Sequence, residues 1–207
     1  MLSFLQKEKR NKIIGILLIV IGIVFWIIPF YNNKVEDKKE DNLINEYIDS
    51  TEQEIIINEP ETVPEETKIV ETIKYSMIIE IPKIGLKKGI YGLDSRYNSI
   101  SYGIQVLKES NMPDIEKGNL ILASHRGNSS VSHFNNLYKL ENGDRVYIYY
   151  NGIKYVYELV NKYDEVKDGT IVVHRNNEDT VLTLISSKKN EEKQTVFINR
   201  LIEKENY

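Results

Sequence analysis

Two adjacent hydroxyl residues, Ser186 and Ser187, end an apolar run that begins at Val181. A short charged connection follows, and then a second run rich in β-branched residues at 195–198, so the pattern predicts a strand, a polar turn and a strand. A strand fixes the position of a hydroxyl while the loop after it leaves the hydroxyl accessible, which suits a serine nucleophile. Serines also begin ordinary turns, and the pair alone does not decide between these interpretations.

A second candidate for chemistry is His125, the last residue of the apolar run that begins at Asn119. A Gly127-Asn128 loop follows it, so we expect the imidazole to be half exposed and rigidly held. Imidazole exchanges protons near neutral pH, which suits a general acid or base. Taken alone, His125 could equally be a surface or packing residue, and His133 and His174 are expected to be ordinary surface residues.

The composition excludes several classes of site. The 207 residues contain no cysteine, which rules out disulfides, thiolate metal sites and a cysteine nucleophile. The three histidines have no HExxH or similar spacing, so we expect no metal site, and no motif indicates a cofactor. A net charge of -4 gives no reason to expect a nucleic-acid partner.

The elements that would hold these residues are short and closely spaced. Asn151-Gly152 is a strong hairpin signal between two alternating runs, and no βαβ rhythm occurs. The pattern predicts an all-β domain over residues 76–207, either an antiparallel-rich closed or nearly closed barrel or a sandwich. The expected strands are 77–81, 119–124, 145–150, 154–159, 171–174, 181–185 and 195–198, and the expected short helices are 98–107 and 132–139.

An apolar stretch at 13–30 precedes this domain and is near the lower length limit for crossing a bilayer. Basic residues, from Lys7 to Lys12, lie before it and acidic residues soon follow it. The positive-inside rule therefore predicts a cytoplasmic tail at 1–12, a single transmembrane helix and an extracellular domain. A cleaved signal peptide is the alternative, although no small-x-small cleavage site follows the apolar stretch.

Residues 31–75 are strongly acidic. Thirteen aspartates and glutamates stand against five lysines between Asn33 and Tyr75, and Pro60 and Pro64 interrupt the segment. Such a composition buries too little apolar surface to offset its ordering entropy. We expect a flexible or locally helical stalk that sets the distance between the domain and the membrane.

Three motifs in series give the chain a family resemblance. They are Ile81-Pro-Lys-Ile84, the run from Ile121 to Arg126 that ends in His-Arg, and Thr183-Leu-Ile-Ser-Ser187. In order and spacing the chain resembles the sortases, cysteine transpeptidases of Gram-positive cell surfaces. The resemblance implies an eight-stranded β-barrel with one or two short helices. It also implies cleavage of an LPxTG-type sorting signal between Thr and Gly through an acyl-enzyme, which an amine on peptidoglycan or another protein then resolves.

Two departures from the family pattern put the activity in doubt. His125 maps onto the family's histidine, but Ser187 stands at the position of its cysteine. The arginine that opens the family's next strand maps onto Gln194. Lys193 could take the arginine's role, whereas Arg200 lies six residues on, roughly 20 Å along a strand.

The departures leave three functions open. The first is a sortase-type transpeptidase impaired at Ser187, whether that serine is natural or introduced to trap a substrate complex. The second is an inactive pseudo-sortase that serves as a sorting-signal-binding surface adaptor. The third is a serine acyltransferase or hydrolase in the same barrel, in which Asp144 or Asp179 would have to approach His125 as the orienting carboxylate. The lack of a C-terminal apolar span makes a pilus-polymerising sortase less expected. The short connection after Ser187 differs from the longer loop common in the housekeeping group, and the choice among class A-like, B-like and D-like sortases stays open.

Overall fold

The computed structural model describes residues 18–19, 21–23, 38, 40–48, 74–127, 130–169, 171–187 and 191–207. The chain divides into two compact units, Met1–Asp41 and Asn42–Tyr207. In the described part of the chain, no helix combines the length and the apolar character that a membrane span requires. Most of the predicted anchor at 13–30 and of the stalk at 31–75 lies outside the described residues.

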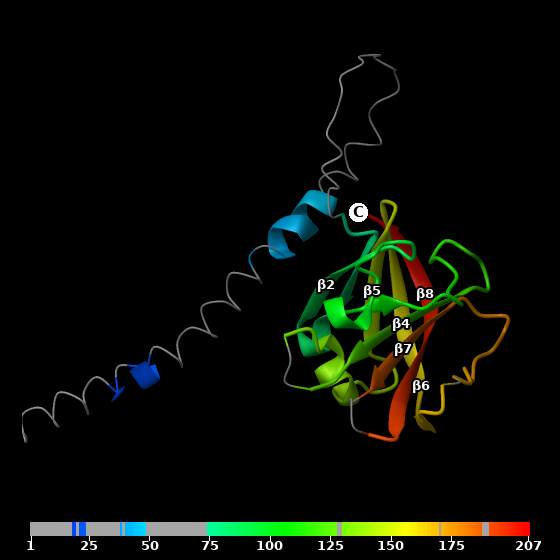
Figure 1. Ribbon diagram of the computed structural model, residues 1–207. Helices are drawn as coiled ribbons and strands as arrows, with labels where there is room; N and C mark the ends of the chain where they lie inside the picture. Colours follow the sequence, from blue (N-terminus) through cyan, green and yellow to red (C-terminus); the bar gives the residue numbers. More distant parts are fainter. Residues whose placement is uncertain are drawn as a thin grey trace, which may run out of the picture. The chain divides into compact units, whose positions relative to one another are not determined.

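Eight strands of this unit form one sheet in the order β2-β1-β5-β6-β8-β7-β4-β3, with three short 3-10 helices between them (Figure 1). The nearly closed eight-stranded barrel that the sequence predicted is thereby confirmed. The strands are β1 (Met77–Ile81), β2 (Leu86–Ile90), β3 (Gln105–Val106), β4 (Asn119–His125), β5 (Arg145–Tyr150), β6 (Ile153–Val166), β7 (Val181–Ser187) and β8 (Lys193–Asn206), and the helices are η1 (Pro82–Ile84), η2 (Ile100–Tyr102) and η3 (His133–Lys139).

The pairing of β4 with β7 is parallel, whereas the other pairings along the sheet are antiparallel. The two strands are in register over their whole length, from Asn119 beside Val181 to His125 beside Ser187. Parallel strands end at the same edge of a sheet. The last residues of β4 and β7 are therefore neighbours.

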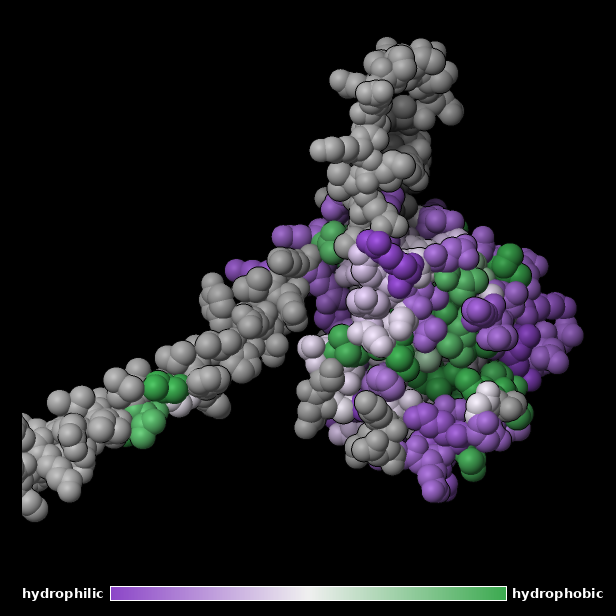
Figure 2. Space-filling model, viewed as in Figure 1, coloured by the Kyte–Doolittle hydropathy of each residue, from purple (hydrophilic) through white to green (hydrophobic). Residues whose placement is uncertain are grey.

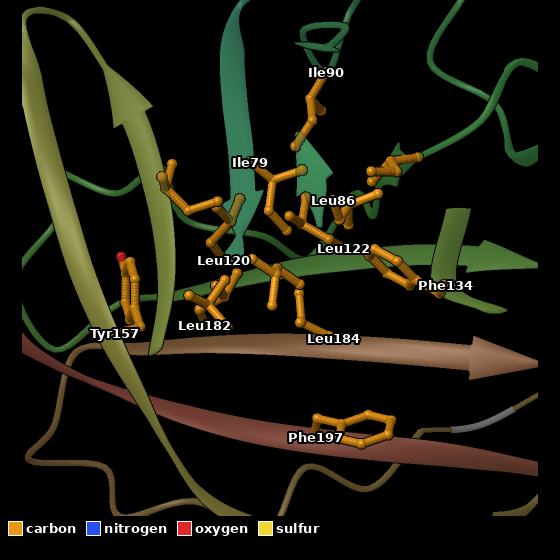
Figure 3. Close-up of a cluster of buried hydrophobic side chains, with 14 of the residues drawn as sticks. Ile79, Leu86, Ile90, Leu120, Leu122, Phe134, Tyr157, Leu182, Leu184 and Phe197 are labelled. Atoms are coloured by element: carbon orange, nitrogen blue, oxygen red, sulfur yellow. The ribbon is translucent and has the colours of Figure 1, made fainter. Parts of the chain in front are cut away.

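Alternation along β4 and β7 separates a core face from an outer face. Leu120 and Leu122 of β4, with Leu182 and Leu184 of β7, point into the central core, where Phe134 also lies (Figure 3). Because successive side chains of a strand point to opposite faces, the odd-numbered residues of both strands lie on the outer face. His125 and Ser187 are odd-numbered members of their strands.

Local signals explain most of the remaining strands. The Asn-Gly turn between β5 and β6 forms as predicted, because Asn151 and Gly152 take the positive φ values of 49° and 74° that such a turn needs. The sequence did not predict β2 and β3. It also placed the ends of β6 and β8 too early, because their polar outer halves are stabilised by pairing with each other.

The predicted helix at 98–107 is wrong over most of its length. Only the single turn of η2 forms, and β3 follows it. The Asn98 side chain accepts a hydrogen bond from the Val106 amide at 2.7 Å and donates one to the Val106 carbonyl at 2.9 Å. This side chain takes the place of a neighbouring strand, so the backbone stays extended at Val106.

The predicted strand at 171–174 is also wrong. This segment has no strand partner and is held by side chains of β6: the Tyr163 hydroxyl donates to the Val172 carbonyl at 2.6 Å, and the Val172 amide donates to Glu165 at 3.0 Å. Its apolar residues Ile171 and Val173 pack on two clusters of the outer face instead. The β-branched side chains of Ile171 and Val173 serve this packing and do not indicate a strand here.

Residues 42–48, which the sequence placed in the stalk, are helical and pack on the barrel. Ile44 and Tyr47 are buried against Ile78 of β1, with Tyr149 of β5 beside them. The Tyr47 hydroxyl donates a hydrogen bond to the Ser76 carbonyl at 3.1 Å. This part of the segment therefore belongs to the domain, because its apolar residues cover a strand face of the barrel.

Candidate active site

The candidate site is a row of three side chains at one end of the outer face. His125 ends β4, Ser187 lies directly beside it at the end of β7, and Gln194 lies opposite Ser187 on β8. Neighbouring strands are about 4.8 Å apart, so each member of the row adjoins the next. Ser187 and Gln194 are both only 7% exposed. Gln194, onto which the family's arginine maps, thus lies directly opposite Ser187.

An apolar band leads to this row along the same face. Ile121 and Ala123 precede His125 on β4, and Ile185 precedes Ser187 on β7. Leu107 and Ile171 pack against these residues from the flanking loops. Figure 2 shows the resulting hydrophobic band over β4 and β7, bordered by hydrophilic side chains. The row thus lies at one end of this band, whose strand residues are at most 8% exposed beneath the partly exposed Leu107 and Ile171.

The ends of β4 and β7 are fixed by hydrogen bonds on the inner side. The Ser186 hydroxyl donates to the Phe134 carbonyl of η3 at 3.1 Å, and the Ser124 hydroxyl donates to the Gly103 carbonyl at 2.9 Å. The Arg126 amide donates to the Ser187 carbonyl at 2.9 Å and extends the ladder by one step. Ser186 is therefore a structural residue, while Ser187 faces the outer side.

An ion pair that the sequence analysis missed lies beside the row. The Arg126 guanidinium donates to the Glu191 carboxylate in the connection between β7 and β8. Arg126 directly follows His125, and Glu191 precedes Gln194 by three residues, so the pair links the two strand ends that carry the row. In the sequence, the signal for this ion pair was the opposite charges of Arg126 and Glu191, which lie near the candidate residues His125 and Gln194.

The two basic residues considered for the arginine role do not lie in the row. Lys193 is the neighbour of Gln194, so its side chain points to the opposite face, and it is exposed beside Val166. Arg200 lies opposite Val181, at the far end of β7 from Ser187. Neither residue replaces the missing arginine, so the position opposite Ser187 carries a neutral amide.

The two aspartates considered as partners of His125 are held elsewhere. Burial alone would raise the pKa of Asp144, but hydrogen bonds from Lys83, at 2.8 Å, and from the Glu141 amide hold it below the usual range. Asp179 precedes Val181, at the opposite end of β7 from the row. The Nδ1 atom of His125 is buried and has no hydrogen-bond partner. Within the described ranges, therefore, no carboxylate orients the imidazole through Nδ1.

The other two histidines have packing roles in this structure. His133 lies against Gly103, where an added Cβ would come within 2.8 Å of its Nε2 atom. The His174 ring packs edge-on against Tyr163 with centroids 4.8 Å apart. Over the described ranges, no three His, Asp or Glu side chains gather in a metal-binding arrangement.

The row can therefore present a hydroxyl beside a histidine, but without two usual supports of acyl transfer. A serine must lose its proton to an aligned base as it attacks, and among the residues that the structure describes no side chain bonds to the Nδ1 atom of His125. A developing oxyanion is stabilised by a fixed donor or cation, and Gln194 offers an amide in place of a guanidinium.

Comparison with known proteins supports the assignment that the motifs suggested. The family model for the Sortase domain matches residues 79–202. The chain is 25% identical over 206 residues to Sortase A of Bacillus anthracis, with 93% of this chain and 95% of that protein covered.

Solved structures show the same fold. Sortase A of Listeria monocytogenes matches with a TM-score of 0.55 at 20% identity, covering 64% of this chain and 90% of that one. A sortase D5 transpeptidase of Clostridium perfringens matches with a TM-score of 0.56 at 22% identity, covering 78% of this chain and 99% of that one. With its barrel, its ordered motifs and the match of the family model over most of the domain, the chain belongs to the sortase family.

Proposed function

We propose that the domain binds an LPxTG-type sorting signal of surface proteins and that its transpeptidase activity is impaired by serine at position 187. One observation carries the proposal: the row of His125, Ser187 and Gln194 closes the apolar band of β4 and β7. An extended signal along this band would bury its apolar residues on the partly exposed Leu107 and Ile171, which pack on the buried Ile121, Ala123 and Ile185. Its Thr-Gly bond would then lie beside Ser187.

The chemistry of the impaired reaction follows from these positions. The Ser187 oxygen would attack the threonine carbonyl while its proton passes to His125, which then protonates the departing glycine amine. The resulting ester would be resolved by an amine, whose proton passes through His125 to the departing Ser187 oxygen as the new amide bond forms. Loss of one oxyanion donor costs about 3 kcal/mol, or roughly a hundredfold in rate, and the weaker nucleophile lowers the rate further.

Two alternative functions rest on parts of the same geometry. An inactive pseudo-sortase that acts as a surface adaptor is favoured by the apolar band, which is present although the thiol and the arginine are replaced. A serine acyltransferase or hydrolase is favoured by the direct adjacency of His125 and Ser187.

Incubation of the full-length chain with LPxTG-type peptides, with and without an amine, separates these functions. We expect saturable binding and slow cleavage that an amine diverts to the ligated product. Binding without any turnover favours the adaptor, and fast turnover that Ser187→Ala abolishes favours the serine enzyme. Absence of binding contradicts the proposal itself.

We also propose that the N-terminus is cytoplasmic, the apolar stretch at 13–30 spans the membrane, and the domain is extracellular. The proposal is supported by the basic residues from Lys7 to Lys12 and the apolar run after them. Protease added to intact, wall-stripped cells should remove the domain while a cytoplasmic marker survives. Survival of both proteins would place the domain inside the cell.

A further inference from the structure

Four tyrosines contact one another in series on the surface of the barrel. The ring centroids are 5.0 Å apart from Tyr75 to Tyr91, 5.3 Å from Tyr91 to Tyr97 and 5.3 Å from Tyr97 to Tyr102. Tyr102 is 57% exposed, and the other three are partly exposed. We call these residues the tyrosine row. In Figure 2, side chains of intermediate hydropathy gather near β2, beside the hydrophobic band.

The backbone holds the tyrosine row in place. The Tyr75 ring lies on the backbone of Gly89 in β2, where an added Cβ would come within 2.2 Å of the ring, so only glycine permits this contact. Asn98 donates to the Leu93 carbonyl at 3.2 Å and pairs with Val106, which fixes the segment that carries the other three rings. A platform that is ordered before binding loses little entropy when a ligand arrives.

The polar groups around the rings are suited to a neutral, hydroxyl-rich ligand. Arg96 donates to the Tyr97 hydroxyl at 2.8 Å, and its guanidinium lies 4.8 Å from the centre of the Tyr97 ring. Residues 91–103 contain one arginine and one aspartate, together with three serines, so the segment has no net charge. A surface that binds anionic lipid carries a cluster of basic residues instead.

We propose that the tyrosine row binds a polysaccharide chain. The faces of sugar rings carry C–H groups that pack on aromatic rings, while sugar hydroxyls at the rim can bond to phenol hydroxyls and to a guanidinium. Tyrosine combines an apolar ring with a polar end and so meets both needs. Rings that contact one another in series match a ligand built of repeated rings.

One end of the tyrosine row is tied to the inner side of β4. Tyr102 adjoins Gly103, whose carbonyl accepts the hydrogen bond from Ser124, and Ser124 directly precedes His125. Binding of a polysaccharide requires no activity of Ser187. A failure of the proposed function would therefore not contradict this inference.

The test is calorimetric titration of the full-length chain with chitohexaose, the β-1,4-linked hexamer of N-acetylglucosamine. We expect saturable binding that Tyr102→Ala and Tyr97→Ala each weaken about tenfold, the loss expected when one aromatic contact is removed. Tyr138→Ala is the matched control, because Tyr138 is 63% exposed and lies outside the tyrosine row. Tyr102→Phe should retain most of the affinity if ring packing dominates.

Three results would overturn the inference. The first is the absence of chitohexaose binding, and the second is binding that Tyr102→Ala and Tyr97→Ala leave unchanged. The third is binding of phosphatidylglycerol vesicles through Tyr102 without any binding of the sugar, which would make the tyrosine row a membrane contact. Circular dichroism melts of each variant show that a lost affinity does not reflect unfolding.

Discussion

Replacing Ser187 by cysteine and Gln194 by arginine should turn the candidate site into an efficient transpeptidase. Ser187→Cys introduces a thiol, whose nucleophilicity depends less on a perfectly aligned base than that of a hydroxyl. The new thiol would lie beside His125, because β4 and β7 are in register at these two residues. We expect cleavage of an LPxTG-type peptide to rise by orders of magnitude over the parent.

Gln194→Arg should add a further increase in that background. Residues opposed on antiparallel strands have Cα atoms about 5 Å apart, so a guanidinium at position 194 would reach an oxyanion formed on residue 187. One such donor contributes about 3 kcal/mol, which corresponds to roughly a hundredfold in kcat. Lys193→Arg is the matched control: it places a guanidinium one residue away on the opposite face and should give no gain.

The assay is cleavage of a quenched fluorescent peptide with and without an amine acceptor, on the full-length chain. His125→Ala in the cysteine background should remove the gain. If the double variant stays inert while it still binds the peptide, the reasoning from the row is refuted and the adaptor function gains support. If Lys193→Arg helps as much as Gln194→Arg, the effect is one of general charge and the assigned position is wrong.

Three further predictions concern binding and stability. Leu107→Asp should weaken sorting-peptide binding more than tenfold in fluorescence anisotropy, because it places a charge at a partly exposed position of the apolar band, whereas Ile202→Asp, at an exposed position of β8, should not. Ile44→Ala should lower the free energy of unfolding in urea by about 2–4 kcal/mol, whereas the exposed Glu46→Ala should have little effect, and equal losses would contradict the packing of residues 42–48. Asp144→Asn should destabilise the protein near neutral pH, because folding lowers the pKa of the Asp144 carboxyl. Such a carboxyl stabilises the folded state above its unfolded pKa and loses that contribution as the pH falls through its folded pKa. The difference between variant and parent in the free energy of urea unfolding should therefore vanish in acid.

The fold was predictable where local signals and burial agree. β1, β5 and β7 combine β-branched residues with clear ends, and Asn151-Gly152 fixed the hairpin between β5 and β6. β2 was missed because its sequence, Leu-Lys-Lys-Gly-Ile, has few β-branched residues and is a strand only through its pairing with β1. The stretch at 171–174 gave the opposite error. Its β-branched residues predicted a strand, but they pack on the outer face without a strand partner.

The site was predictable through motifs and not through local pattern. Neither His125 nor Ser187 reveals in its own neighbourhood that the other lies beside it, because the parallel pairing of β4 with β7 joins segments far apart in the sequence. The family resemblance supplied that link, and the register agrees with it. The pair of Arg126 and Glu191 depends on the same long-range placement and was beyond the reach of local reasoning.

The parallel contact between β4 and β7 also sets an order of assembly for the chain. The hairpin of β5 and β6 closes over two residues, whereas β4 meets β7 only after the intervening η3, β5 and β6 have been accommodated. Closing a long loop costs more entropy than closing a short one, and contacts between distant segments form late in folding. During synthesis from the N-terminus, β4 with His125 is therefore available early. The pair of His125 and Ser187 forms only after β7 has been made and has paired with β4. Pulse-labelling hydrogen exchange should find the amides of β7 protected after those of β5 and β6. The candidate site would then form only once the whole domain has folded.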